Sequence, residues 1–204
     1  MAIQQTLRPF RDYNEKDVVN LFAYSGGALV DTTYQILATK GTVVKINSPG
    51  VRLDLDPENM IGNMGLNNVN NFVGQRYGVT YTVTAAGPSD NAIGILLYDV
   101  RELDENGEFL KYRPQKAAEM EAVLSGQACP IATVGTFLYS GIQTGGGAGQ
   151  TGVAVTAGGP VYVYANGGLC TTGTTRVGRF YGSTGVTGAY GDGTTTALVK
   201  LDFN

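Results

Sequence analysis

The stretch Ile131-Ala-Thr-Val-Gly-Thr-Phe-Leu-Tyr139 is rich in β-branched and aromatic residues, which favour a β-strand. Further strand candidates follow it, and glycine-rich turns such as residues 145–152 separate them: Val153–Thr156, Pro160–Tyr164, Val177–Tyr181 and Thr195–Phe203. Upstream segments of the same kind are Gly41–Asn47, Tyr77–Thr84 and Ala92–Tyr98. Short strands joined by glycine-rich turns predict a β-barrel, a sandwich, or an α+β fold in which β predominates.

One helix is expected among these strands. In Pro114–Gly126, proline begins the segment and glycine ends it, and the alanine, methionine, leucine and glutamate residues between them favour helix. The fold class is therefore mainly β, barrel- or sandwich-like, with one short helix near 114–125 and an extended N-terminal arm. A short helical turn is expected at Glu15–Leu21.

The composition changes after Glu121. Of the 14 Lys/Arg and 17 Asp/Glu residues, only five follow it, whereas 19 of the 30 glycines do. We interpret this shift as three parts: an arm over residues 1–20, a charged β-rich lobe over residues 21–121 that ends in the helix, and a glycine-rich, β-barrel-like lobe over residues 122–204.

Several functions are disfavoured by the composition. The net charge of −3 gives no global attraction to nucleic acid or to an anionic membrane, and no apolar run is long enough for a membrane helix. The absence of histidine removes the commonest general base and the commonest transition-metal ligand. Residues 145–152 lack the lysine that ends a P-loop. We therefore expect no enzyme, no cofactor, no metal, no nucleic-acid partner and no membrane partner.

Three pairs of residues remain as candidates for other roles. Asp54 and Asp56 could share a strand face, but their spacing fits a solvated edge better than an EF-hand. Cys129 and Cys170 are expected to be two small buried side chains, with a single disulfide as the alternative. Tyr162 and Tyr164 lie two apart on one strand, so both rings face one side, where they suit core or subunit-interface packing.

The C-terminal part carries a series of short motifs. Ala132–Tyr139 leads to a strand with the pattern G-x-P-V-Y-V at residues 158–163, an N-G-G turn at Asn166, a V-G-R strand at Val177 and a closing strand at Thr195–Phe203. Together with Asn91–Val100, this order resembles the small β-barrel decoration, or cement, proteins of tailed-bacteriophage heads. The resemblance covers roughly residues 90–204.

The resemblance implies a capsid-surface protein of the virion, made in the host cytoplasm, that straddles neighbouring subunits of the major capsid protein, often as a homotrimer. It implies no catalytic residues. An extended arm suits such a role, because it can add a strand to the sheet edge of a neighbour. Its expected contacts are Leu7, Arg8, Pro9, Phe10, Arg11 and Tyr13. Phe10 and Tyr13 would be the anchors, and Arg8 and Arg11 would meet acidic capsid groups.

Two other functions remain open on the sequence. A phage tail or fibre component shares the glycine-rich β composition, although no internal repeat is evident. A carbohydrate-binding module could use the tyrosines as a platform for sugar rings.

Overall fold

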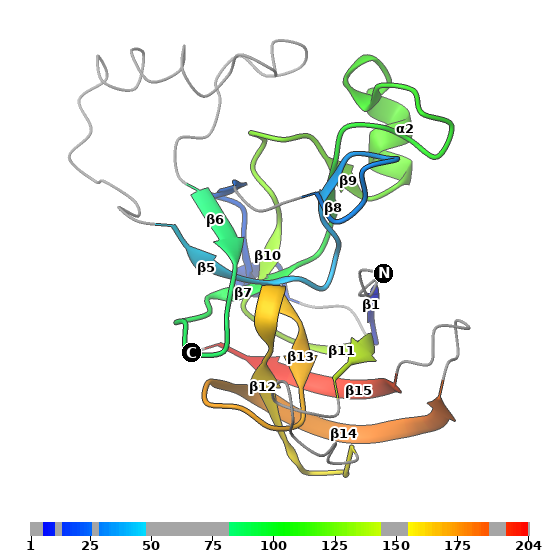
Figure 1. The fold of residues 1–204 in the computed structure, drawn as a ribbon. Coiled ribbons are helices and arrows are strands. Elements are labelled where there is room, and N and C mark those ends of the chain that lie inside the picture. The colour runs from blue at the N-terminus through cyan, green and yellow to red at the C-terminus, as the bar shows by residue number, and fades with distance from the viewer. Residues whose placement is uncertain are drawn as a thin grey trace, which may run out of the picture.

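The computed structural model describes residues 6–10, 14–25, 29–47, 82–143, 155–187 and 195–203, with the side chains of residues 6, 184–187 and 195 left aside. Three antiparallel or mixed sheets form three tiers, with the only described α-helix beside the uppermost one (Figure 1). The prediction of a mainly β fold with one short helix is confirmed. Within the described residues no sheet closes into a barrel, so the fold is sandwich-like.

Sheet A, the lowest tier in Figure 1, has six strands in the order β1-β11-β15-β14-β12-β13. Long strands from the C-terminal part of the chain make up its centre. The bounds are β1 Thr6–Pro9, β11 Val134–Ile142, β12 Pro160–Val163, β13 Leu169–Cys170, β14 Arg176–Thr187 and β15 Thr195–Asp202. A short 3-10 helix, η3 (Ala165–Gly167), joins β12 to β13.

Sheet B, the middle tier, also has six strands, in the order β2-β10-β7-β5-β6-β3. All are short: β2 Val18–Val19, β3 Ala23–Tyr24, β5 Val43–Ile46, β6 Thr82–Ala85, β7 Gly94–Leu96 and β10 Ile131–Ala132. The helical turn expected near residue 15 is the 3-10 helix η1 (Glu15–Asp17), where the Asn14 side chain accepts a hydrogen bond from the Lys16 N–H.

Sheet C has three strands, β4 (Ile36–Ala38), β8 (Asp99–Arg101) and β9 (Ala122–Val123), and lies beside η2 (Leu110–Tyr112) and α2 (Pro114–Glu119). The helix is shorter than the expected 114–126. Glu121 takes a left-handed conformation with φ of 49°, and the next two residues pair in parallel with β8. Ala122 and Leu124 are thereby buried against Leu110, and this burial outweighs their helix propensity.

The main core lies between sheets A and B. Inward-facing residues of sheet A, including Phe137, Tyr139 and Phe180, pack in one cluster with Val43, Ile95 and Leu97 from the region of sheet B. Alternate residues of β11 (Phe137 and Tyr139) and of β15 (Ala197, Val199 and Leu201) belong to this cluster, so the opposite face of sheet A is directed away from sheet B.

Strands from all three expected parts of the chain are mixed among the sheets. β1 comes from the expected arm but joins sheet A, and β10 comes from the glycine-rich part but joins sheet B. Of the other strand candidates, Val153–Thr156 lies partly outside the described residues and its described end is not a strand, whereas the described end of Tyr77–Thr84 falls within β6.

Candidate functional site

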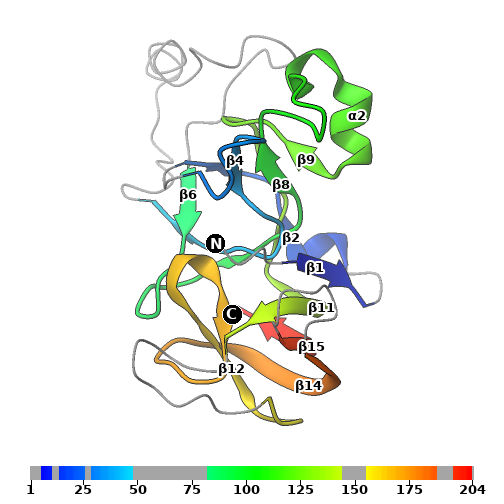
Figure 2. The ribbon, with the colours of Figure 1, turned by 45° about the vertical axis from the view of Figure 1, so that its right-hand side comes forward.

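The N-terminal arm pairs with the chain's own sheet. β1 runs antiparallel to β11, with Arg8 opposite Leu138, and the Phe10 N–H continues the ladder by donating to the Thr136 carbonyl at 3.1 Å. Figure 2 shows β1 next to β11, with β15 and then β14 following across sheet A. On this side of β1, the main-chain hydrogen bonds that could have paired with a neighbouring subunit are therefore made to β11 of the same molecule.

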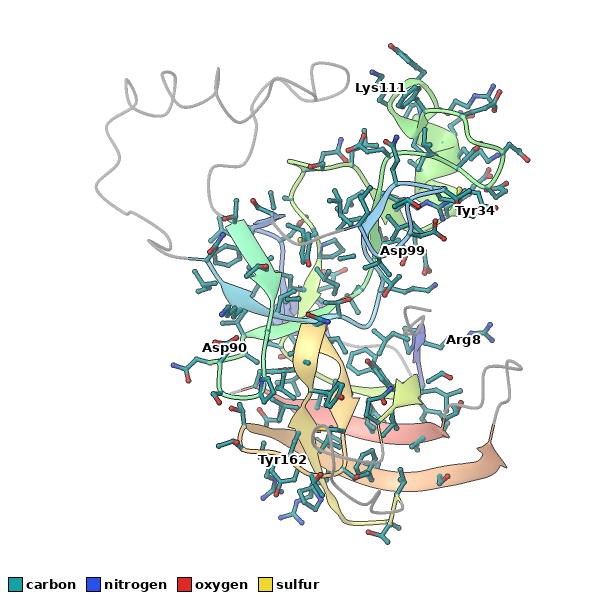
Figure 3. All side chains as sticks on the ribbon, in the orientation of Figure 1. Arg8, Tyr34, Asp90, Asp99, Lys111 and Tyr162 are labelled. Carbon is teal, nitrogen blue, oxygen red and sulfur yellow. The ribbon has the colours of Figure 1, made fainter. Side chains whose placement is uncertain are left out.

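The expected arm contacts have different environments. Leu7 is only 3% exposed and belongs to the main core, beside Gly41. The expectation that Leu7 contacts a partner is therefore wrong, because its side chain is used in folding. Arg8, Pro9 and Phe10 are exposed, Phe10 to 55%. Arg8 projects away from the sheet in Figure 3. Arg11 and Tyr13 lie outside the described residues.

Phe10 lies in a row of side chains that crosses the outer face of sheet A. Thr136 stands opposite Lys200, Lys200 opposite Arg179, and Arg179 opposite Pro160. Because directly opposite residues on neighbouring strands share a face, this row runs from β1 to β12, roughly 19 Å at the usual strand spacing. The two ends of the chain thus contribute to one surface.

A hollow of about 340 Å³ lies on this face over β14 and β15. Its lining contains three cations and one carboxylate: Arg176, Gly178, Arg179, Tyr181, Lys200 and Asp202. Four of the five charged residues that follow Glu121 are therefore gathered at one place. A protein whose net charge is −3 thus carries a locally positive surface.

Two bulges in β14 help to set which side chains reach the hollow. One lies opposite the Val161/Tyr162 step and brings Arg176 opposite Tyr162, while Val177 is buried in the core. The other lies between Phe180 and Gly182 and leaves Tyr181 52% exposed. Bulges of this kind redirect side chains, and here they present an arginine and a tyrosine on the outer face.

The two arginines are held by main-chain carbonyls. Arg176 Nε donates to the Gly178 carbonyl at 3.3 Å, and Arg179 Nη1 donates to the Gly158 carbonyl at 3.4 Å. Among the described residues, no ion pair involves Arg176, Arg179 or Lys200, whereas Lys40, Lys45, Arg113 and Lys116 all have carboxylate partners. The cations of the hollow therefore retain hydrogen-bonding capacity for an incoming acceptor.

Tyr162 and Tyr164 occupy the outer side of β12 and its extension. Both are half-buried, whereas the intervening Val163 and the preceding Val161 are fully buried, as the alternation predicts. The turn that contains Gly173 covers part of Tyr162, since a Cβ on that glycine would lie 2.8 Å from the Tyr162 Cβ. Tyr162 is next to Arg176 in the β12–β14 ladder and lies at the opposite end of sheet A from Arg8 (Figure 3).

Other reactive side chains are buried or structural. Cys129 and Cys170 are both free and buried, and burial raises the pKa of the Cys129 thiol to about 12, so the reactive thiolate is suppressed. Asp99 is a half-buried carboxylate that accepts the Lys40 N–H at 2.7 Å, and desolvation raises its pKa. Asp54 and Asp56 lie outside the described residues.

The described ranges contain no group of three or more His, Cys, Asp or Glu side chains arranged to hold a metal ion. Within the same ranges, no helix has both the length and the apolar character needed to cross a bilayer.

No protein-family model, curated protein or solved structure matches the chain. The candidate site therefore depends on its own geometry. Arg176, Arg179 and Lys200 are not predicted as a group from the sequence, although a signal for them exists. They are rare charges in a charge-poor segment. In the last strand, alternation also places Lys200 on the same face as Leu198 and Asp202.

Proposed function

We propose that this protein is a structural component of a phage virion, a decoration or cement protein that binds the outside of the head between major capsid subunits and stabilises the shell. The observation that carries this proposal is the outer face of sheet A. There, exposed Phe10 shares one cross-strand row with two cations of the hollow, Arg179 and Lys200. The motif order of residues 132–203, which resembles that of head decoration proteins, supports the same function.

The composition of this face suits attachment to an acidic protein surface. Phe10 supplies an exposed aromatic ring, and half-buried Leu138 and Leu198 lie beside the row on the same face. Arg8, Arg179 and Lys200 add positive charge around these apolar groups. Aromatic residues and arginines are the residue types most often found in the binding hot spots of protein interfaces.

Positive charge on one face of an acidic protein also orients the protein as it approaches its partner. An acidic capsid surface would repel most of the molecule and attract the outer face of sheet A. A shell offers many equivalent sites, so modest contacts at each site add up to substantial stabilisation of the whole particle.

We further propose that the protein acts as a homotrimer, with the exposed parts of Tyr162 and Tyr164 at the subunit interface. Both rings are half-buried and lie near the edge of sheet A formed by β12 and β13. Sedimentation velocity on the purified protein tests this arrangement. A mass near three times 21.4 kDa supports the trimer, and a single species of 21.4 kDa at micromolar concentration contradicts it.

Co-sedimentation with capsids tests the proposed function. Undecorated, expanded capsids of the parent phage are mixed with increasing amounts of the folded protein and pelleted. Saturable binding at a fixed ratio to the major capsid protein supports a decoration role. Absence of binding by a protein with a cooperative thermal transition contradicts it. Binding of the same protein on a glycan array instead would favour a carbohydrate-binding module.

A further inference from the structure

We propose that the hollow over β14 and β15 binds a carboxylate group of the protein partner, held between Arg179 and Lys200. This inference rests on the proposed function, because it assigns the chemistry by which the outer face of sheet A recognises a capsid subunit. The partner group is an aspartate or glutamate side chain on an exposed acidic segment.

The strongest support is the pairing of two like charges. Arg179 and Lys200 are directly opposite in the β14–β15 ladder, and both side chains are exposed on the outer face. Like charges at directly opposite positions destabilise a sheet. Neither cation is in an ion pair with a carboxylate among the described residues. An anion placed between them converts this repulsion into two attractions.

The donor geometry favours a carboxylate. Arg179 has one Nη1 hydrogen bond to Gly158, which fixes the side chain and leaves other guanidinium N–H groups to donate. A planar guanidinium fork matches the two oxygens of a carboxylate, and the Lys200 ammonium adds a point charge from the next strand. Arg176 and the Tyr181 ring complete the lining.

Asp202 limits the charge that the hollow can accept. Among the described residues of the lining it is the single carboxylate, and its negative charge disfavours a second one near Lys200. A group with one negative charge is therefore favoured over a phosphate dianion. The volume of about 340 Å³ is at the lower end of the range for small-ligand pockets, and it accommodates an acidic side chain with part of its backbone.

An acidic peptide fits this surface better than an acidic sugar. Among the described residues that line the hollow, Tyr181 is the one aromatic ring. A bound sugar would be limited to this ring and to the charged groups of the lining. A protein segment can instead continue from the hollow along the Lys200–Thr136–Phe10 row towards the exposed aromatic ring.

The test is a binding titration with the full chain. A fluorescein-labelled hexaglutamate peptide is titrated at low ionic strength, with hexaglutamine and hexagalacturonate as comparison probes. The altered protein is Arg179→Gln/Lys200→Gln. The matched control, Lys16→Gln/Lys111→Gln, removes the same charge from residues outside the hollow. Arg179, Lys200 and Lys16 are exposed, and Lys111 is half-buried over the Phe109 and Tyr112 rings, so a thermal melt checks that each variant is folded.

We expect the Arg179→Gln/Lys200→Gln variant to bind hexaglutamate at least tenfold more weakly and the control variant to bind within about twofold of the wild type. Equal weakening in both variants would mean that net charge alone drives binding, which overturns the site. Unchanged affinity in the hollow variant overturns it as well. Tighter binding of hexagalacturonate than of hexaglutamate overturns the assignment to a peptide.

Capsid binding separates this inference from the proposed function. If wild type and the hollow variant bind capsids equally, the function stands and the carboxylate site is wrong. If the peptide results are as expected but wild type does not bind capsids, the site stands and the decoration function is wrong.

Discussion

Arg179 on β14 stands directly opposite Lys200 on β15, so two cations occupy one cross-strand position on the outer face of sheet A. The same row continues through Thr136 to Phe10 at the N-terminal end of the chain. A sheet could avoid this repulsion with any neutral residue at either position. The anionic partner that we propose would relieve this repulsion.

Neutralising one of these two cations should stabilise the isolated protein. For Arg179→Gln we expect the melting temperature to rise by about 1–2 °C at low ionic strength, because cross-strand repulsion is removed. The rise should disappear in about 0.5 M salt, where the charges of the wild type are screened. Differential scanning calorimetry at the two salt concentrations measures this, and Lys16→Gln, at an exposed lysine, is the control. A lower melting temperature for Arg179→Gln at low salt would show that its hydrogen bond to Gly158 matters more than the repulsion.

Leu7 in β1 and Phe10 just after it should separate stability from binding. Leu7→Ala creates a cavity in the main core and should lower the free energy of unfolding by about 2–5 kcal/mol. Phe10→Ala removes an exposed ring, so it should change that free energy by less than about 0.5 kcal/mol but weaken capsid binding severalfold. Urea unfolding and co-sedimentation measure the two effects. Equal destabilisation by both substitutions would contradict the assigned orientation of β1.

A pair of glycines tests the contact between the two large sheets. Gly167 in η3 has φ of 75°, and a Cβ there would lie 2.6 Å from the Val43 carbonyl oxygen of β5. Gly158 has a similar φ of 80° but no heavy atom within 4 Å of the corresponding position. Alanine at Gly158 should therefore cost about 1–2 kcal/mol for its left-handed conformation alone. Alanine at Gly167 should cost about 3 kcal/mol or more, because it adds overpacking between the sheets.

Chemical denaturation of Gly158→Ala and Gly167→Ala measures the difference between the two glycines. Equal costs would show that η3 does not pack closely on β5.

The loop that contains Asp104 should make stability depend on acidic pH. The ammonium of Lys116, 2.7 Å from one oxygen of this carboxyl, and the N–H groups of Glu108 and Asn106 lower its pKa from 3.8 to about 2. Since the folded-state pKa is depressed, the contribution is fully present above about pH 4 and is lost as the pH falls towards 2.

We expect Asp104→Asn to lower the melting temperature at pH 7 and to narrow its difference from wild type as the pH falls from about 4 to about 2. Thermal melts across this range measure the effect, with Glu119→Gln, an exposed carboxylate of α2, as the control. A difference that stays constant from pH 7 to pH 2 would contradict the assigned role of the ion pair.

The sequence predicted the class of fold well because strand signals are local. The alternation in Pro160–Tyr164 and in the last strand requires only neighbouring residues, and the structure places both in sheet A. The expected burial of Cys129 and Cys170 is confirmed. The helix was predicted at the correct start, but its end was wrong because tertiary pairing of Ala122 with β8 decided it.

The candidate site was harder to predict because it depends on pairing between distant segments. Nothing near Phe10 in the sequence indicates that it shares a row with Lys200, since that relationship passes through the registers of β1 on β11 and of β11 on β15. Leu7 was expected on the surface because the arm shows no periodicity from which its inward direction could be inferred. The bulges in β14 also shift side chains between faces, and strict alternation cannot predict them.

The most direct test of the account is an electron cryomicroscopy reconstruction of expanded capsids incubated with the protein. We predict additional density at regular positions between major capsid subunits, into which the structure fits with the outer face of sheet A towards the shell and the Arg179–Lys200 pair close to an acidic residue. Saturated particles without such density, or density in which this face is directed away from the shell, would contradict the account.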